Sequence, residues 1–226
     1  LARAGADVVR VDRDPRGLAE AEDEAENLPG GRSATLIADL LDRSGIQDLV
    51  EKAGEFFGAP DILINAAGIN TREAADDVTP ENWDVTLDLN LSAPFFLAQG
   101  FVPAMKQNGF GRIINFASLQ SFRAFPAGMA YGTSNGGVTQ MTRAMAEAWS
   151  SFGITANALA PGFFRTELTA PVFEDPDRAA RNAAQTCIGR NGEPEDIDGP
   201  LMFFCSPASS YVTGQVLPVD GGYTAK

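Results

Sequence analysis

The sequence predicts an α/β fold in which a doubly wound, mostly parallel sheet carries helices on both faces. Short, mostly apolar runs alternate with stretches of helical period along the whole chain. Strands buried on both faces and separated by helices are typical of parallel β-α-β units. The chain also has no internal repeat, low-complexity segment or linker that would divide it. At 226 residues, we therefore expect one domain over residues 1–226.

Each expected element follows from such a run. The strands are expected at residues 7–11, 34–38, 62–64, 112–116, 155–159 and 215–219. The helices are expected at residues 46–57, 83–105, 129–149 and 195–205, and the acidic run from Glu20 to Glu26 reads as a solvated helix face. Residues 166–190 are rich in Pro, Ala and Asp with weak periodicity, so we expect a long excursion that covers a functional site.

Composition excludes several classes of partner and site. The formal net charge of −13 argues against nucleic acid and anionic membranes as partners. The chain has no His, and Cys187 and Cys205 lie far apart, so no metal site is expected and two free thiols suit a reducing cytoplasm. No stretch approaches the roughly 20 apolar residues of a membrane span. We expect a cytoplasmic protein with a small-molecule partner.

Five motifs follow one another in a defined order. A small-residue turn after the strand at 62–64 comes first, followed by an asparagine between two leucines, a serine and a tyrosine 13 residues apart, a Pro-Gly turn, and a Gly-rich C-terminal segment. The residues concerned are Asn65-Ala66-Ala67-Gly68, Asn90, Ser118, Tyr131, Pro161-Gly162, Thr166, Val212-Thr213-Gly214 and Val219-Asp220-Gly221-Gly222. In this order, from Gly5 to Gly222, the chain resembles the classical short-chain dehydrogenase/reductase family.

The resemblance implies a Rossmann-type fold and hydride transfer between a nicotinamide cofactor and a secondary alcohol or ketone. It makes Tyr131 the proton donor or acceptor, Ser118 the hydrogen-bond partner of the substrate oxygen, and Asn90 a catalytic asparagine. The cofactor contacts that it implies in the centre of the chain are Asn65, Ala66, Ala67, Gly68, Tyr131, Asn135, Pro161, Gly162 and Thr166.

Asn135 departs from the family pattern. The segment Tyr131-Gly132-Thr133-Ser134-Asn135 ends in a neutral residue where the family has a lysine, whose charge lowers the pKa of the tyrosine. Asn135 can still hydrogen-bond a ribose hydroxyl but cannot supply the charge. No cation lies between Tyr131 and Arg143, about 18 Å further along the helix, so we expect no neighbour to replace it. The expected loss of activity is on the order of 10²–10⁴-fold.

The end of the second expected strand of the family fold, at residues 7–11, bears on cofactor choice. Asp12 lies where NAD-using relatives place an acid for the ribose hydroxyls, whereas Arg13 is typical of NADP enzymes, and we favour NAD over NADP. Asp39 and Leu40 resemble the family's adenine-pocket pair, although Asp39 could equally be a helix N-cap.

The first strand of the family fold and its Gly-rich turn are not recognisable in the sequence. Residues 1–6 read as the end of the helix that follows that turn, so we expect both to be missing from this chain. The strands on either side would then carry unpaired backbone edges inside the protein.

The substrate prediction rests on further resemblance. The segments Gly68–Arg72 and Ser118–Phe122 are most similar to gluconate 5-dehydrogenase and 2-deoxygluconate 3-dehydrogenase relatives. The expected substrate contacts are Arg72, Ser118, Gln120 and Arg123, with Arg72 as a bidentate clamp for a carboxylate and Arg123 as the second candidate. A surface position for Arg72 is the alternative.

These observations predict an NAD(P)-dependent oxidoreductase that acts on sugar acids or similar hydroxy-acids. The alternative is a catalytically impaired pseudoenzyme that serves as a binding or oligomer subunit. The resemblance also implies a homotetramer, and the long helix at 129–149 and the apolar residues 212–223 are consistent with one, although a place in the core explains them equally well.

Overall fold

Parallel strands with flanking helices make up the structure, a computed structural model that describes residues 1–26 and 30–226. The strands in this part of the chain are β1 (Val8–Asp12), β2 (Ser33–Ile37), β3 (Ile62–Asn65), β4 (Gly111–Phe116), β5 (Ile154–Pro161) and β6 (Val216–Val219). Every strand pair is parallel. The predicted α/β fold is confirmed, and each expected strand is present with both ends within two residues of the expectation.

The helices both confirm and correct the sequence prediction. They are α1 (Pro15–Glu26), α2 (Ile46–Phe57), α3 (Pro80–Leu87), α4 (Ala93–Asn108), α5 (Met129–Trp149), α6 (Ala170–Phe173), α7 (Pro176–Gln185) and α8 (Asp198–Cys205). Helices α2 and α5 have the expected bounds. The helix expected at 83–105 is longer, because a π-helical turn, Asp88–Ser92, joins α3 to α4.

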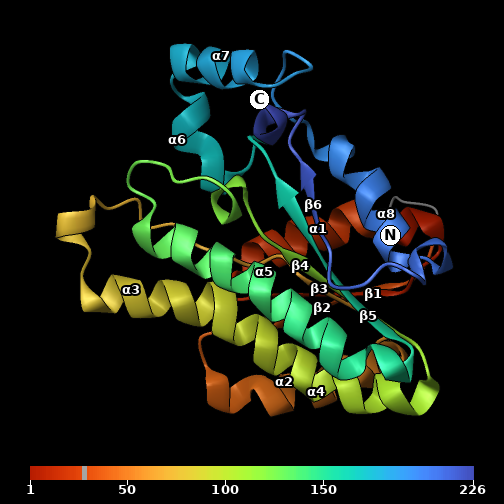
Figure 1. The fold of residues 1–226 in the computed structure, drawn as a ribbon. Coiled ribbons are helices and arrows are strands. Elements are labelled where there is room, and N and C mark those ends of the chain that lie inside the picture. Colours follow the sequence, from red (N-terminus) through yellow and green to blue (C-terminus); the bar gives the residue numbers. More distant parts are fainter. Residues whose placement is uncertain (27–29) are drawn as a thin grey trace.

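The excursion expected at 166–190 contains two helices that its weak periodicity did not predict, α6 and α7 (Figure 1). Pro171 and Pro176 lie in the first turn of these helices, where a missing N–H has no consequence for the hydrogen-bond ladder. The Asp175 side chain accepts a hydrogen bond from the Arg178 backbone and caps α7. The Pro and Asp residues that make this segment resemble a loop in composition are therefore helix starts.

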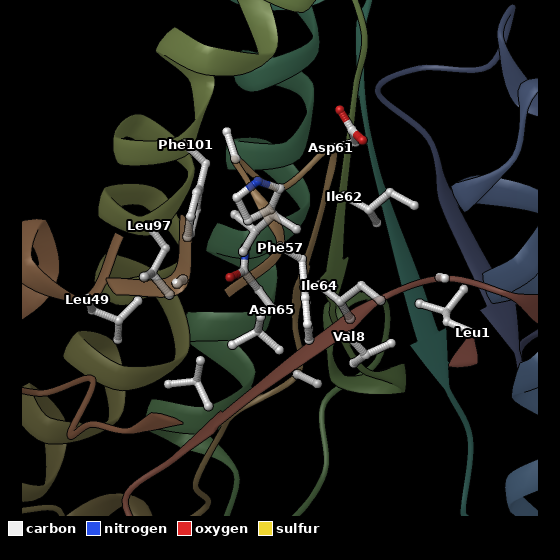
Figure 2. A pocket seen from close by; sticks show the side chains of 18 of the residues that line it. Leu1, Val8, Leu49, Phe57, Asp61, Ile62, Ile64, Asn65, Leu97 and Phe101 are labelled. Carbon is white, nitrogen blue, oxygen red and sulfur yellow. The ribbon is translucent and has the colours of Figure 1, made fainter. Parts of the chain in front are cut away.

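The sheet is divided between β1 and β3. Strand β1 pairs with β2, and the other strands form a second sheet in the order β3-β4-β5-β6. A cavity of about 460 Å³ lies between the two sheets. Figure 2 shows Val8 of β1 across it from Ile62 and Ile64 of β3, with Leu97 and Phe101 of α4 along one side. The prediction that a first strand is missing from this chain stays a prediction.

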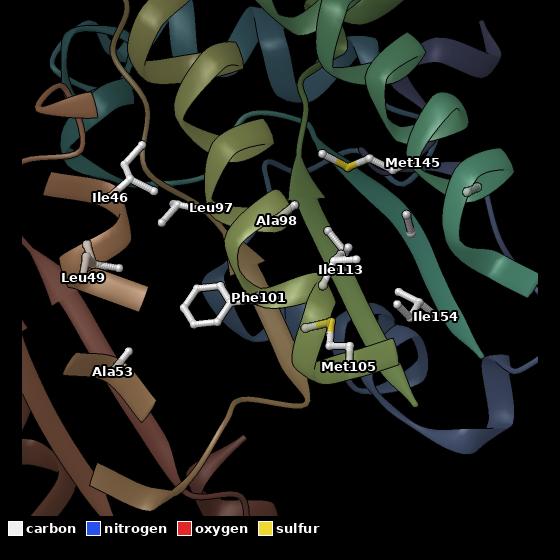
Figure 3. Close-up of a cluster of buried hydrophobic side chains, with 13 residues drawn as sticks. Ile46, Leu49, Ala53, Leu97, Ala98, Phe101, Met105, Ile113, Met145 and Ile154 are labelled. Atoms are coloured by element: carbon white, nitrogen blue, oxygen red, sulfur yellow. The ribbon is translucent and has the colours of Figure 1, made fainter. Parts of the chain in front are cut away.

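The main core lies on one face of the larger sheet and joins three helices to it. Ile46 and Leu49 of α2, Phe101 of α4 and Met145 of α5 meet Ile113 of β4 there (Figure 3). On the opposite face, a smaller cluster joins the sheet to α8 through Ile114, Leu159, Phe204 and Cys205. Consecutive residues of β4 thus face opposite layers, as the alternation of side chains along a strand requires.

Helical residues Pro80–Asn108 correct the expectation about membrane spans. By length and composition this run could cross a membrane, with a mean hydropathy of 1.2 in its most apolar window. Its buried residues, among them Leu97, Ala98 and Val102, pack into the main core. The hydropathy of the run is therefore explained by its contacts inside the domain.

A chain of buried amides attaches α5 to the strands. Asn65 Nδ2 of β3 donates to Asn115 Oδ1 of β4 at 2.8 Å, and Asn115 Nδ2 donates to Thr142 Oγ1 of α5 at 2.9 Å. All three residues are buried. Because a buried polar group without a partner is costly, these bonds fix the position of α5 along the sheet.

Replacing Asn115 with Ala should lower the free energy of unfolding by about 2 kcal/mol or more, since it leaves the Asn65 amide without its acceptor and opens a small void. Urea unfolding followed by circular dichroism measures the change. The exposed Gln140→Ala variant on the same helix is the matched control. Equal changes for the two variants would contradict a structural role for the amide chain.

Candidate active site

A second cavity, of about 520 Å³, opens at the carboxyl ends of β3, β4 and β5. Loops that follow these strands, the first turns of α5, and the α6–α7 segment line it. It brings together most of the residues predicted from sequence, namely Ala66, Ala67, Gly68, Arg72, Asn90, Ser118, Gln120, Tyr131, Asn135, Pro161, Gly162 and Thr166. Ala66 and Ala67 line this cavity and the one between β1 and β3 alike, so the two cavities adjoin along the edge of the sheet.

Ser118 and Tyr131 reach the cavity from different elements. Ser118 follows β4, and its Oγ accepts a hydrogen bond from the Gln120 backbone at 3.2 Å at the start of a short 3-10 helix, Leu119–Ser121. Tyr131 lies in the first turn of α5. The two hydroxyls interact, and hydrogen bonding to Ser118 acts on the pKa of Tyr131. They can therefore address one substrate oxygen, as the sequence predicted.

Burial raises the pKa of Tyr131 above its ordinary value. Hydrogen bonds to Ser118 and Asn135, and the positive charge of Arg72, act in the opposite direction without overcoming the effect of burial. The phenol is therefore protonated at neutral pH, which suits a proton donor and weakens a proton acceptor.

The side chain of Asn135 is turned back onto its own helix. Its Nδ2 donates to the Tyr131 carbonyl oxygen at 2.8 Å, and Ser134 Oγ donates to the same oxygen at 2.8 Å. Both residues are buried. The side-chain amide of Asn135 is thus neutral, and its Nδ2 already has a hydrogen-bond partner.

The charge of Arg72 opposes the rise in the pKa of Tyr131 only weakly, so it does not replace the missing lysine. Arg72 follows β3 and has a φ of 56°, a left-handed conformation that is uncommon outside glycine. Its backbone N–H donates to Asn70 Oδ1 at 3.1 Å, and its Nη2 donates to the Leu168 carbonyl oxygen at 2.6 Å. Arg72 is half-buried and lines the cavity, which excludes the alternative of a free surface residue.

Asn90 lies in the π-helical turn and is buried. Its Nδ2 donates to the Ile69 carbonyl oxygen at 2.9 Å and to Ser134 Oγ at 3.1 Å, while the Ile69 N–H donates to Asn90 Oδ1 at 2.9 Å. A Cβ on Gly68 would approach that Oδ1 to 3.3 Å, so a larger residue would crowd the contact. Asn90 therefore holds the loop after β3 against α5 and positions the site.

The predicted adenosine end of the cofactor site lies at the carboxyl ends of β1 and β2. Asp12 and Asp39 are exposed, and each closes a local turn: Asp12 Oδ1 accepts from the Asp14 N–H and Asp39 Oδ1 from the Leu41 N–H. The alternative of Asp39 as a helix N-cap is wrong, since Asp42 caps the next helix. Leu40 and Asn65 line the cavity between β1 and β3.

Two residues predicted for the site have other contacts, and one lining residue was not predicted. Arg123 is exposed and lies over the ring of Tyr223, 5.3 Å from its centroid, outside the cavity. The Asn65 side chain belongs to the core amide chain. Arg178 of α7 lines the cavity, and its position on a helix that the sequence did not reveal explains why it was missed.

Comparison with known proteins extends this description. The family model described as Enoyl-(Acyl carrier protein) reductase matches residues 1–224. The chain is 39% identical over 229 residues to 2-dehydro-3-deoxy-D-gluconate 5-dehydrogenase of Dickeya dadantii, covering 100% of this chain and 88% of the relative. It is 38% identical over 226 residues to gluconate 5-dehydrogenase of Gluconobacter oxydans, covering 99% and 87%.

A solved structure agrees with these relatives. The chain superposes with a TM-score of 0.94 on a gluconate 5-dehydrogenase from Burkholderia cenocepacia J2315, which was crystallised in complex with NADP and tartrate. The sequence identity is 34%, and the match covers 100% of this chain and 88% of the other. NADP in this relative makes NADP at least as well supported as the NAD that Asp12 favours.

Proposed function

The chain belongs to the short-chain dehydrogenase/reductase family of oxidoreductases, and we propose that it interconverts a secondary alcohol and a ketone on a sugar acid or similar hydroxy-acid. The charge of the cavity carries the proposal: its only charged lining residues in the described chain are arginines, Arg72 and Arg178. This cationic lining occurs in a chain with a net charge of −13. A substrate carboxylate fits such a lining, and the names of the relatives also point to sugar acids.

The described residues at the carboxyl ends of β3, β4 and β5 fit the nicotinamide end of a dinucleotide. The small, exposed residues Ala66 and Ala67 leave backbone accessible at this edge of the sheet. Asp12 would hold the adenosine ribose at one end. Asn135 and the Pro161–Gly162 turn would hold the nicotinamide end. When bound, the dinucleotide supplies or accepts the hydride.

The proton is moved by residues of the chain itself. The protonated Tyr131 hydroxyl gives its proton to the oxygen of a ketone, and Ser118 Oγ donates a hydrogen bond to that oxygen. In the direction of alcohol oxidation the same hydroxyl must first be ionised. Because burial raises the pKa of Tyr131, the lack of a lysine at position 135 hinders oxidation more directly than reduction.

The pH dependence should differ between the two directions. From about pH 6 to about pH 9 the phenol stays protonated, so the rate of ketone reduction should be nearly constant. Alcohol oxidation needs the phenolate, and its rate should rise about tenfold per pH unit over the same range. Asn135→Lys should raise oxidation at pH 7 by about 10²–10⁴-fold and give a plateau at high pH.

Steady-state assays with gluconate and its keto-acid in both directions provide the measurement. Asn135→Gln, which keeps a neutral amide, is the matched control and should not raise the rate. Tyr131→Phe should remove activity in both directions. An unchanged oxidation rate in Asn135→Lys would contradict the assignment of Tyr131 as the proton-transfer group.

A second candidate function is a subunit that binds a dinucleotide without turning it over. The buried, neutral Asn135 beside a phenol of raised pKa favours it. Under this alternative the protein would bind NADH and reduce no keto-acid above background. Recovery of turnover in Asn135→Lys would then identify the loss of one charge as the reason for inactivity.

Arg72→Ala should raise KM for hydroxy-acids by about tenfold or more, because a charge-assisted hydrogen bond to the carboxylate is lost. KM for a neutral polyol should change much less. Arg123→Ala is the matched control, since Arg123 lies outside the cavity and should leave both KM values unchanged. Equal effects of Arg72→Ala on acids and polyols would contradict carboxylate recognition.

Asp12 and Arg13 should set the choice between NAD and NADP in opposite directions. Both are exposed at the end of β1, where Asp12 repels a 2′-phosphate and Arg13 attracts it. Asp12→Ala should raise kcat/KM for NADP relative to NAD by about tenfold, and Arg13→Ala should lower that ratio by a similar factor. Shifts of the ratio in the same direction for both variants would contradict the assignment.

The proposal includes a homotetramer in the cytoplasm. Exposed apolar side chains occur at both places that the sequence singled out, Met129 on α5 and Leu217 on β6. Phe203 on α8 adds to this exposed apolar surface. Burial of such side chains against further copies would account for their exposure in the single chain.

A further inference from the structure

We propose that the segment Asp220–Lys226 holds helix α7 against the cavity, and that Lys226 is the residue through which it positions Arg178 for the substrate. The effect on the substrate rests on the proposed function, whereas the attachment of α7 does not. Figure 1 shows the C-terminal end of the chain close to α7, and hydrogen bonds join the two.

The Lys226 ammonium bonds the carboxyl end of α7. Its Nζ donates to the Ala184 carbonyl oxygen at 3.2 Å and to the Thr186 carbonyl oxygen at 2.8 Å. The last carbonyl groups of a helix lack partners within it, and the helix dipole makes this end negative. A cation therefore stabilises it. Among the described residues, no carboxylate pairs with Lys226 instead.

The residues before Lys226 are bonded to the turn that follows α7. The Gly221 carbonyl oxygen accepts from the Cys187 N–H at 2.8 Å and from the Ile188 N–H at 3.2 Å. Gly221 and Gly222 have φ values of 62° and 79°, and a Cβ on Gly222 would lie 2.8 Å from the Cys187 Cβ. Glycine at both positions therefore permits the close approach of the two segments.

Tyr223 connects the same segment to two walls of the cavity. Its buried ring lies 6.2 Å from the ring of Phe125 and 5.7 Å from that of Phe163, measured between centroids. Both phenylalanines line the cavity. Tyr223 begins the short 3-10 helix Tyr223–Ala225, which ends next to Lys226. One short segment thus contacts two cavity walls and the helix beside them.

Arg178 is the cavity residue whose position depends on α7. It lines the cavity, and its guanidinium has no hydrogen-bond or ion-pair partner in the described chain, so it is available to an anion. Asn191 Nδ2 donates to the Ala179 carbonyl oxygen of α7 at 3.1 Å. Without the Lys226 contact, this bond is a point about which the helix can rotate, and rotation changes the direction of Arg178. Lys226 is therefore a positioning residue that acts through Arg178.

Trypsin tests the attachment directly, because Arg178 and Arg181 lie in α7 and are cleaved only when the helix opens. Lys226→Met should increase the rate of cleavage after these residues about threefold or more, since the helix end loses its cation. Lys226→Arg should keep the original rate. Cleavage after Arg143 in α5 is the internal control, and Lys106→Met in α4 is the matched variant; mass spectrometry identifies each site.

Kinetics with the keto-acid of gluconate test the role in substrate binding. Lys226→Met should raise KM about threefold or more and leave kcat nearly unchanged, and Lys226→Arg should restore KM. In the Arg178→Gln background, Lys226→Met should have no further effect on KM, because the residue that it positions is gone.

Equal rates of α7 cleavage in Lys226→Met and the unchanged protein would overturn the inference. Faster cleavage after Arg143 as well would overturn it too, because the variant would then be unstable throughout. Additive effects of Lys226→Met and Arg178→Gln on KM would overturn the role in substrate binding. A protein without turnover would contradict the proposed function, and the cleavage of α7 would still decide whether Lys226 attaches the helix.

Discussion

The buried amide chain from Asn65 through Asn115 to Thr142 is the constraint on which the geometry of the site depends. It fixes α5 against β3 and β4 with bonds that no solvent can replace. Since α5 carries Tyr131, its position along the sheet determines whether that hydroxyl meets Ser118 at the end of β4. Asn90 of the π-helical turn bonds both Ile69, on the loop after β3, and Ser134, on the same helix. The position of α5 therefore determines how its Tyr131 lies relative to the residues that follow β3 and β4.

Burial favours proton donation by Tyr131 and disfavours proton acceptance by it. A dry site strengthens hydrogen bonds to a developing charge, and it also penalises the phenolate itself. The neutral contacts from Ser118 and Asn135 offset only part of this penalty. The cavity is therefore suited to donating a proton without a nearby cation, and accepting one depends on positive charge brought from outside α5.

The sequence predicted the strands and the two regular helices α2 and α5, because their periodicity reports burial directly. It missed α6 and α7, since Pro and Asp at helix starts have the same composition as a loop. Arg123 is a further difference, because proximity to Ser118 in sequence does not place it in the cavity.

The neutral residue at position 135 leaves burial as the dominant influence on the acid–base behaviour of Tyr131. A phenol whose pKa is raised holds its proton, which favours the direction that donates a proton to a ketone. The reverse reaction must ionise the phenol against burial. A lysine on α5 would offset that penalty, because its positive charge stabilises the phenolate.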